Sequence, residues 1–335
     1  MRTPRHLIAL LLLVLLASGC TTANPTDPVE SPVRHSEPPP APTTAAPTVP
    51  PVDKALLQEA ITVYREISSV QQKANFAGGF AVDRTPAEYP KYLMGGALMS
   101  AVGYSTYLHQ EKLRRKSGTQ TLQHIQHYPV MVAGSLVSLS GCLEQTDLFI
   151  AGEDGWGYRG QSTVEFVHFK RDSDGGLKIF DWDSSPVETC TKVAADPGLV
   201  KQAAAIHDTV MRLFAQHLSA GGLNQAHYPT SGFGPYLGTD ARNGLLRDLE
   251  LARTTWDMTV TGPFKPGRVT VWPYQYESSE VALTSCFDRS PMHFTNPTGG
   301  SSRGTPRIYF AYYKKDSAGV LRLEWLNSVS VDACQ

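Results

Sequence analysis

The sequence predicts an α+β fold of two tandem domains, each with N-terminal helices packed on a curved antiparallel sheet. The first reason is a duplication: Cys142 and Cys190 recur, 144 residues later, as Cys286 and Cys334. The second is that helical apolar spacing precedes strand-like segments in both repeats, an order typical of α+β folds. A period this long has the size of a domain rather than of a solenoid repeat.

The offset of 144 residues recurs away from the cysteines. Lys170-Arg171-Asp172-Ser173 matches Lys314-Lys315-Asp316-Ser317. Trp182 and Trp325 miss by one position, which predicts a one-residue slip near the end of each repeat. The expected domain bounds are 53–194 and 195–335.

In the first repeat, helical spacing of Leu57, Ile61, Tyr64 and Ile67 predicts an opening helix with Asp53 as its N-cap. A second helical region includes Tyr92-Leu93, runs to about Arg115 and ends before Gly118. Strand-like segments then follow, rich in β-branched and aromatic residues. They are 124–143, 164–169 and 177–182.

The second repeat has the same order of elements. Asp196 and Pro197 suit the start of its opening helix, and the second helical region runs from about Asp240 to about Thr259, before Gly262. Its strand-like segments are 268–276, 280–287, 307–313 and 321–326. Each repeat of about 140 residues is long enough to bury a core of its own.

The N-terminus predicts export and lipidation. Two arginines precede an unbroken apolar run, Leu7 to Leu16, which is shorter than the span of about 20 residues that crosses a bilayer. Small residues and Cys20 follow, so residues 1–19 are expected to be a signal peptide. The junction resembles the lipobox of bacterial lipoproteins, which implies acylation (palmitate) of Cys20 and a membrane anchor on the extracytoplasmic face. A plain secretory signal is the alternative.

Residues 20–52 are expected to be a Pro/Thr-rich linker. Ten of the 32 residues from Thr21 to Val52 are proline, a composition that favours extended polyproline II segments and cannot bury a core. This segment would hold the domains away from the bilayer.

The remaining four cysteines predict two disulfides. They are even in number and symmetric between the repeats, and disulfides belong outside the cytoplasm. Of three connectivities, the duplication favours Cys142–Cys190 and Cys286–Cys334. A zinc site is the alternative, and it is disfavoured because no CxxC or paired His lies nearby.

Composition and motifs exclude several classes. The formal net charge is −1 and no basic patch with interleaved aromatics stands out, so nucleic acid is not an expected partner. No P-loop, HExxH or GxGxxG motif occurs, and no cofactor or metal is expected. The aspartates Asp172 and Asp174 suit a solvated turn better than a Ca²⁺ site.

The order of elements, the Tyr92-Leu93 motif and the strand that ends near Cys142 resemble nuclear transport factor 2-like domains, in an actinobacterial lipoprotein form. This resemblance implies two tandem cone-shaped domains, each with a mouth able to hold a small ligand. It also implies that the two domains form an intramolecular pseudo-dimer through their sheets. Such cones include cyclases, isomerases, binding modules and adaptors, so the resemblance implies fold more than function.

The enzymes among these relatives resemble polyketide cyclases and steroid isomerases, and they place Asp, His and Tyr inside the cone. The matching candidates here are His127, Asp147, Tyr158 and His168. His168 shares one strand face with Val164 and Phe166, and an imidazole on an apolar face can act as a general base.

The alternative is that His168 is a satisfied core residue, because Tyr312 occupies the matching position of the second repeat. With Tyr312 included as the equivalent of His168, the candidate pocket residues are His168, Asp147, Tyr158 and Tyr312. The segment 156–160 is expected to be a mobile aromatic loop, with 296–304 as its polar counterpart.

The expected function is a membrane-anchored extracytoplasmic lipoprotein that acts as a non-catalytic binding or scaffolding module in the cell envelope. Its partner would be an envelope protein or a small apolar ligand. The alternative is an enzyme of the polyketide cyclase or isomerase type that uses a cone pocket in the first domain.

Overall fold

The computed structural model describes most of the chain from Val52 to Cys334. The described ranges are 52–129, 132–254, 259–261, 265–295 and 299–334. The expected signal peptide, Cys20, nearly all of the linker and the start of the 296–304 segment lie outside them.

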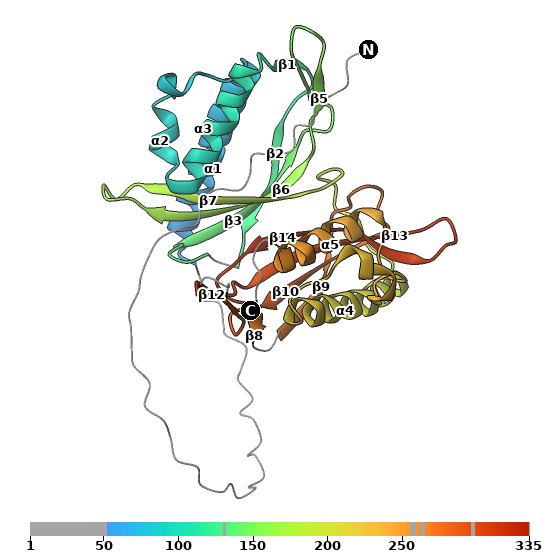
Figure 1. The fold of residues 1–335 in the computed structure, drawn as a ribbon. Helices are drawn as coiled ribbons and strands as arrows, with labels where there is room; N and C mark the ends of the chain where they lie inside the picture. The colour runs from blue at the N-terminus through green and yellow to red at the C-terminus, as the bar shows by residue number, and fades with distance from the viewer. Residues whose placement is uncertain (1–51, 130–131, 255–258, 262–264, 296–298, 335) are drawn as a thin grey trace, which may run out of the picture. The chain divides into compact units, whose positions relative to one another are not determined.

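The first repeat begins with helices and continues with strands (Figure 1). Its helices are α1 (Lys54–Phe76), η1 (Val82–Arg84), α2 (Glu88–Tyr92) and α3 (Gly95–Gln110). Its strands are β1 (Arg114–Ser117), β2 (Thr121–His127), β3 (Val137–Glu144), β4 (Phe149–Ala151), β5 (Gly157–Arg159), β6 (Thr163–Arg171) and β7 (Leu177–Pro186).

The second repeat has the same order except that, among its described residues, α2 has no helical counterpart. Its helices are α4 (Pro197–Ser219), η2 (Gln225–Thr230) and α5 (Thr239–Thr254). Its strands are β8 (Thr259–Thr261), β9 (Lys265–Trp272), β10 (Val281–Asp288), β11 (His293–Thr295), β12 (Ser301–Arg303), β13 (Arg307–Lys315) and β14 (Leu321–Ser330).

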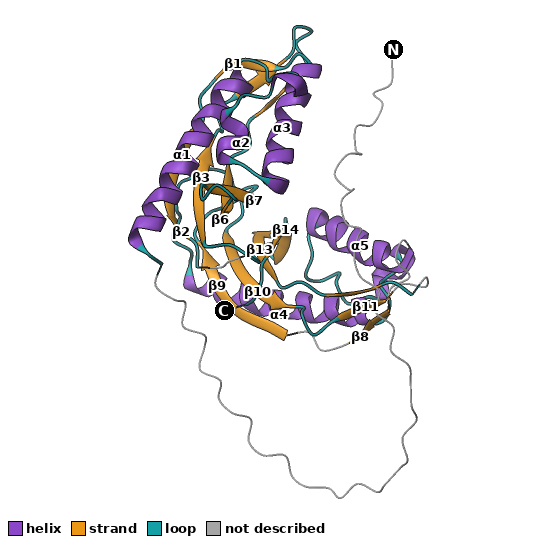
Figure 2. Cartoon of the chain, turned by 90° about the vertical axis from the view of Figure 1, so that its left-hand side faces the viewer, coloured by secondary structure: helices purple, strands orange, loops and turns teal. Residues whose placement is uncertain are grey.

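Within the described residues each repeat has one four-stranded and one three-stranded sheet, and the named strands pair antiparallel. The larger sheets have the orders β2-β3-β6-β7 and β9-β10-β13-β14, and the smaller ones β1-β4-β5 and β8-β11-β12. The helices of each repeat pack on a curved sheet, so the predicted α+β class is confirmed (Figure 2).

The opening helices begin where the sequence predicts. The Asp53 carboxylate accepts hydrogen bonds from the backbone N–H of Ala55 and Leu56, and Asp196 accepts one from Leu199. These bonds satisfy N–H groups that have no partner within the first turn of a helix. Both predicted N-caps are therefore confirmed.

The repeats differ in length by one residue, but the extra residue does not lie near Trp182 and Trp325, where the sequence predicted it. Helices α1 and α4 match at an offset of 143, whereas every element from α3 onward matches at 144. The extra residue lies between Gly222 and Leu237. No slip occurs near the end of the repeats. In the strand register the equivalent of Trp182 is Leu326, and the equivalent of Trp325 is Asp181.

The predicted second helix of the first repeat was too long. Helix α3 stops at Gln110, Lys112 adopts a positive φ of 53°, and Arg114–Ser117 pairs with β4 as β1. Helix α5 is described as far as Thr254, and residues 255–258, just before its predicted end, lie outside the described residues. The predicted strand 124–143 is two strands, β2 and β3, and the predicted mobile loop contains β5, which pairs with β4.

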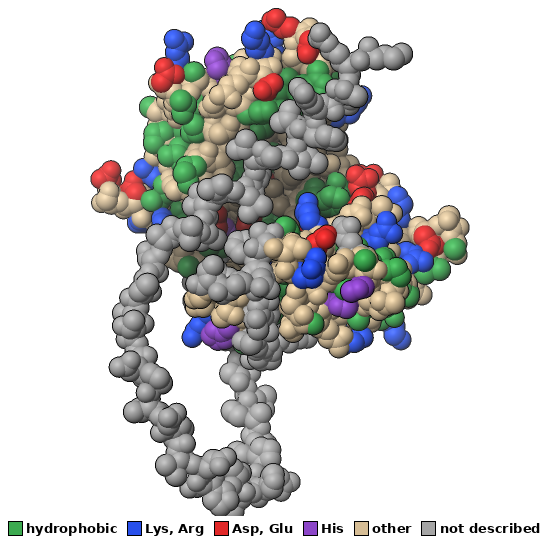
Figure 3. Space-filling model, viewed as in Figure 1, with side chains coloured by type: hydrophobic (Ala, Val, Ile, Leu, Met, Phe, Trp, Pro, Cys, Tyr) green, Lys and Arg blue, Asp and Glu red, His purple; other side chains and the backbone are tan. Residues whose placement is uncertain are grey.

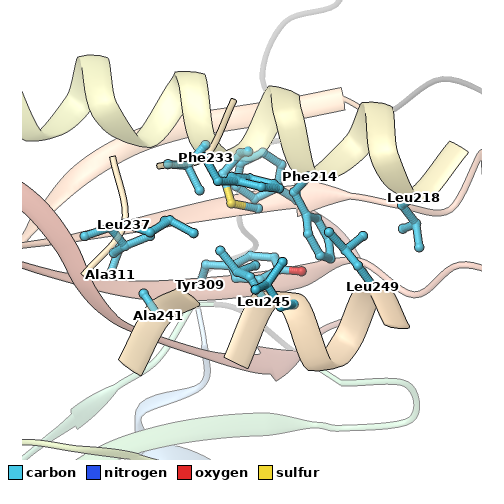
Figure 4. Close-up of a cluster of buried hydrophobic side chains, with 14 of the residues drawn as sticks. Phe214, Leu218, Phe233, Leu237, Ala241, Leu245, Leu249, Tyr309 and Ala311 are labelled. Atoms are coloured by element: carbon cyan, nitrogen blue, oxygen red, sulfur yellow. The ribbon is translucent and has the colours of Figure 1, made fainter. Parts of the chain in front are cut away.

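Each repeat has a core between its helices and its larger sheet. In the second repeat, Phe214 of α4 and Leu245 and Leu249 of α5 point toward one another over Tyr309 and Ala311 of β13 (Figure 4). The corresponding core of the first repeat contains fully buried side chains from α1, α2, β3, β6 and β7. They include Tyr64, Ile67, Tyr89, Leu139, Val167, Phe169 and Ile179.

A third core joins the two repeats, which lie in one compact unit of the chain, 46–335. At its centre Phe166 stacks on Phe310, its equivalent at the offset of 144, with ring centroids 5.2 Å apart. The flanking pairs Tyr128–Phe166 and Trp272–Phe310 have the same centroid distance, 4.8 Å. The sheets therefore pack against each other about an approximate twofold relation.

The structure contains both disulfides that the duplication favours. Cys142 bonds to Cys190 and Cys286 to Cys334, each across a sequence separation of 48 residues. Both members of the first bond are buried in the core that joins the repeats. Each bond ties a central strand of the larger sheet to the segment that follows the last strand of the repeat.

Candidate functional site

His168 lies on the sheet face that meets the other repeat, not on the face under the helices. Its neighbours on that face, Val164 and Phe166, belong to the core that joins the repeats. Its Nδ1 is 2.7 Å from the hydroxyl of Ser138, and both residues are buried. Burial lowers the pKa of His168 to about 4, against the opposite effect of Asp181, so the ring is neutral near pH 7.

Tyr312, the equivalent of His168, also faces the other repeat. Its hydroxyl donates to the carbonyl of Pro186 at 2.8 Å and lies 3.2 Å from the hydroxyl of Ser185. Burial raises the pKa of Tyr312 to about 12. Its role in the structure is a hydrogen-bonded contact between the repeats.

Asp147 and Tyr158 lie at the smaller sheet of the first repeat. Asp147 is exposed in the turn before β4, where its carboxylate accepts from the backbone N–H of Thr119. The Tyr158 hydroxyl is 2.9 Å from that of Tyr104, and burial raises its pKa. The structure does not bring the candidate pocket residues together in one pocket, because His168 and Tyr312 lie between the repeats and Asp147 and Tyr158 lie at the smaller sheet.

The acid beneath the helices of the first repeat is Glu165. It follows Val164 on β6, so its side chain points to the opposite sheet face, toward α1. The Tyr64 hydroxyl donates to its carboxylate at 2.5 Å, and Trp182 is a second hydrogen-bond partner. Burial raises the pKa of Glu165 to about 7, although both hydrogen bonds act in the lowering direction.

Gly141 makes room for this pair. It is the cross-strand partner of Glu165, and a Cβ at this position would approach the Tyr64 ring to 2.9 Å. The glycine on β3 therefore lets the tyrosine of α1 reach the sheet.

His207 occupies the place of Tyr64 in the second repeat, at the helix offset of 143. Its Nδ1 is 2.8 Å from the Tyr313 hydroxyl and its Nε2 is 2.6 Å from the Ser285 hydroxyl. The ring is fully buried, and burial lowers its pKa to about 4. Each repeat thus encloses a polar network at this position of its opening helix, built from different residues.

The sequence contained a signal for Glu165, a lone acid within the apolar segment Thr163–Phe169. The strand-face argument selected the other face of β6 because it started from His168. Tyr64 lies 101 residues away, so no local pattern connects it to Glu165.

The turn aspartates are structural. Asp172 accepts from the backbone N–H of Asp174 and Gly176 and pairs with Lys178 at 2.7 Å. Asp316 repeats this arrangement with Arg322, also at 2.7 Å. Within the described residues no group of three or more His, Cys, Asp or Glu side chains is placed to hold a metal ion.

A groove of about 660 Å³ lies on the second repeat, between α5, Tyr228 of η2 and Trp325 of β14. Two arginines of α5, Arg242 and Arg247, line it, and the Arg242 guanidinium lies over the Tyr228 ring at 5.6 Å. Figure 3 shows Lys and Arg side chains over α5. The volume falls within the range of about 300–1,000 Å³ that is usual for ligand sites. Its lining is Tyr228, Asp240, Arg242, Asn243, Gly244, Leu246, Arg247 and Trp325.

Two smaller cavities lie elsewhere. One of about 240 Å³ lies between the repeats, lined by residues of both, including Gln126, Ser140, Trp272 and Thr284. The other, about 150 Å³, lies between α1 and the strands β2 and β3, next to Arg65 and Gln72. Neither is lined by Glu165 or His207, the polar groups beneath the helices.

Fold and site together define an α+β protein with a duplicated unit of helices and antiparallel sheet, an open groove on the second copy and two disulfides. No protein-family model matches the chain, and no curated protein matches it in sequence. None of the helices in the described ranges has the length and apolarity needed to cross a bilayer.

Two solved structures are similar to the chain. The intermembrane space region of the chloroplast protein ARC6 has 15% sequence identity and a TM-score of 0.30, over 41% of this chain and 99% of that one. ActVI-ORFA from Streptomyces coelicolor has 11% identity and a TM-score of 0.27, over 40% of this chain and 97% of that one.

Proposed function

We propose that the chain is a non-catalytic binding or scaffolding module of the cell envelope. In this proposal it consists of two tandem nuclear transport factor 2-like domains, 53–194 and 195–335. Acylated Cys20 holds it at the extracytoplasmic face of the membrane. Two disulfides agree with an oxidising compartment.

The observation that supports a non-catalytic function is that the polar side chains inside the protein are buried and hydrogen-bonded. His168, Glu165 and His207 are buried, and each is hydrogen-bonded to a neighbouring side chain. A general base must reach the proton it abstracts, directly or through one water. Groups already occupied by buried partners are suited to stabilising a fold, whereas the 660 Å³ groove is open to a ligand.

Native mass spectrometry of the full chain, released from detergent micelles, tests this proposal. A reproducible extra mass that is lost on denaturation supports a binding module. If only the bare chain is found, cross-linking at the membrane should identify a protein partner. Failure of both measurements contradicts the proposal.

Lipid anchoring is tested separately. The full chain should incorporate labelled palmitate in a bacterial host that makes lipoproteins, and Cys20→Ala should remove the label. Labelling that persists in the variant, or a soluble wild-type protein, contradicts the anchor without affecting the binding proposal.

Glu165 favours a second candidate, an enzyme of the cyclase or isomerase type in the first repeat. A carboxyl with a pKa of about 7, next to a tyrosine, has the acid strength of a general acid-base catalyst. Such an enzyme would need an opening of α1 from the sheet to admit substrate. Turnover of a cyclase or isomerase substrate by wild type, and its loss in Glu165→Gln, would favour this candidate.

A further inference from the structure

We propose that the groove on α5 binds a small organic anion. Arg242 and Arg247 would hold a carboxylate or phosphate group, and Tyr228 and Trp325 would contact an adjoining apolar or aromatic part. This inference rests on the proposed binding function and assigns its site and ligand class.

The charge of the groove carries the first step. Arg242 and Arg247 are exposed, and in the described part of the chain neither is within ion-pair distance of a carboxylate. Arg247 does act electrostatically on the neighbouring Asp248 carboxyl, lowering its pKa, although partial desolvation raises that pKa by more. Asp240 also lines the groove, so two positive charges face one negative charge there.

Guanidinium groups suit this role. Their planar N–H donors match the oxygen atoms of carboxylates and phosphates, and they stack on aromatic rings. The cation-π contact of Arg242 with Tyr228 fixes one guanidinium at the groove wall without using a carboxylate partner. Its outward N–H donors therefore remain for a ligand.

Trp325 adds a second observation. It lines the groove, and its indole Nε1 is buried without a hydrogen-bond partner among the described residues. A buried donor of this kind is usually completed by a water or a ligand. Because this nitrogen is buried, an acceptor on a bound anion would complete it once the indole turned toward the groove.

The first repeat shows that the fold does not require these residues. At equivalent positions of α3, Arg242 is replaced by Leu98, Asn243 by Met99 and Arg247 by Gly103, and Asp181 of β7 stands in place of Trp325. Met99 is exposed there, with 61% of its surface accessible. The helix packs on its sheet in both repeats, so the arginines that line the groove of the second repeat are not needed for the helix to pack.

Calorimetric titration of the full chain in detergent tests the proposal with three probes: phenyl phosphate, inorganic phosphate and neutral benzyl alcohol. We expect phenyl phosphate to bind most tightly, and its affinity to fall as salt screens the arginines. Equal binding of benzyl alcohol, or no binding of phenyl phosphate at millimolar concentration, overturns the proposal. Dihexanoyl phosphatidylglycerol, as a fourth probe, distinguishes a lipid headgroup from a free phosphate ester.

Arg242→Leu combined with Arg247→Ala removes both guanidinium groups and copies the apolar character of α3. We expect at least tenfold weaker binding of phenyl phosphate, because charge-assisted hydrogen bonds are among the stronger polar contacts. Arg212→Ala on α4, exposed and outside the groove, is the matched control. Unchanged affinity in the double variant overturns the proposal.

Two readouts keep the test decisive. Trp325→Phe keeps an aromatic ring but loses the N–H donor, so weaker binding in this variant supports the site even if the arginine variant unfolds. In native mass spectrometry, an extra mass that persists in the arginine variant places the ligand elsewhere. That result overturns this inference and leaves the proposed binding function intact.

Discussion

At Glu165, burial and hydrogen bonding act on the same carboxyl in opposite directions. Burial dominates and raises its pKa from 4.5 to about 7. Between these values the folded chain holds a proton that the unfolded chain releases, so this residue lowers stability as pH rises from about 4.5 to about 7.

Glu165→Gln should remove this dependence. The free energy of unfolding of wild type, relative to the variant, should fall by about 3 kcal/mol between pH 4.5 and pH 7.5. Urea unfolding at a series of pH values measures it. Taking the difference cancels the contribution of His207, whose lowered pKa acts in the opposite sense, and of Asp183, whose pKa is raised to about 6. A difference that is flat with pH would show that the carboxyl is not perturbed.

His168→Ala should destabilise the fold rather than act selectively on an activity. The substitution leaves a cavity in a buried face and removes the partner of the Ser138 hydroxyl. We expect a loss of about 2–4 kcal/mol in the free energy of unfolding, measured with urea. An exposed histidine, His109 of α3, provides the control and should change little when replaced by Ala.

At the scale of elements, capping and periodicity predicted the opening helices, because Asp53 and Asp196 have a local physical role. Strand β1 had no such signal. Its four residues, Arg114–Ser117, are all exposed, and the strand that it pairs with, β4, lies more than 30 residues further on. The small sheets therefore could not be predicted from apolar alternation.

The misplaced slip has a similar cause. Trp182 and Trp325 are the same residue type on equivalent strands, but they occupy different backbone positions and face opposite sides of their sheets. Matching side chains suggested a shift that the hydrogen-bond register does not have. Side-chain type alone also did not reveal Glu165, because His168 and Glu165 are three positions apart on β6 and point to opposite faces of the sheet.

The disulfide that closes the second repeat should contribute to its stability. Cys286→Ser combined with Cys334→Ser opens a loop with a sequence separation of 48 residues. We expect a loss of about 2–5 kcal/mol in the free energy of unfolding under oxidising conditions. Under reducing conditions wild type and variant should converge.

Peptide mapping without reduction is the companion measurement. It should find Cys142 linked to Cys190 and Cys286 linked to Cys334. Linkages that cross between the repeats would contradict both the pairing and the expected effect of the double substitution.

At the scale of the whole molecule, the core that joins the repeats should make them unfold together. Phe166 and Phe310 are almost fully buried against each other, and Tyr312 bonds to the other repeat. We expect one calorimetric transition for the wild-type chain, with equal calorimetric and van't Hoff enthalpies.

Phe166→Ala and Phe310→Ala should each lower the free energy of unfolding by about 3–5 kcal/mol, and the double variant by less than the sum. The non-additivity arises because the two rings contact each other. Leu139→Ala, within the core of the first repeat alone, is the control for coupling with Phe310→Ala. Strict additivity of the phenylalanine pair would contradict packing between the repeats.

The sheet-to-sheet contact also has a consequence for concentration. Two separate chains that met through such a face would dissociate on dilution, whereas here a peptide segment joins the partners, so their local concentration is fixed by the tether. Only one repeat needs to carry a given surface residue, since the tether always keeps the two repeats together. The arginines of the groove therefore occur once per assembled pair, which gives a single site where a symmetric dimer would have two.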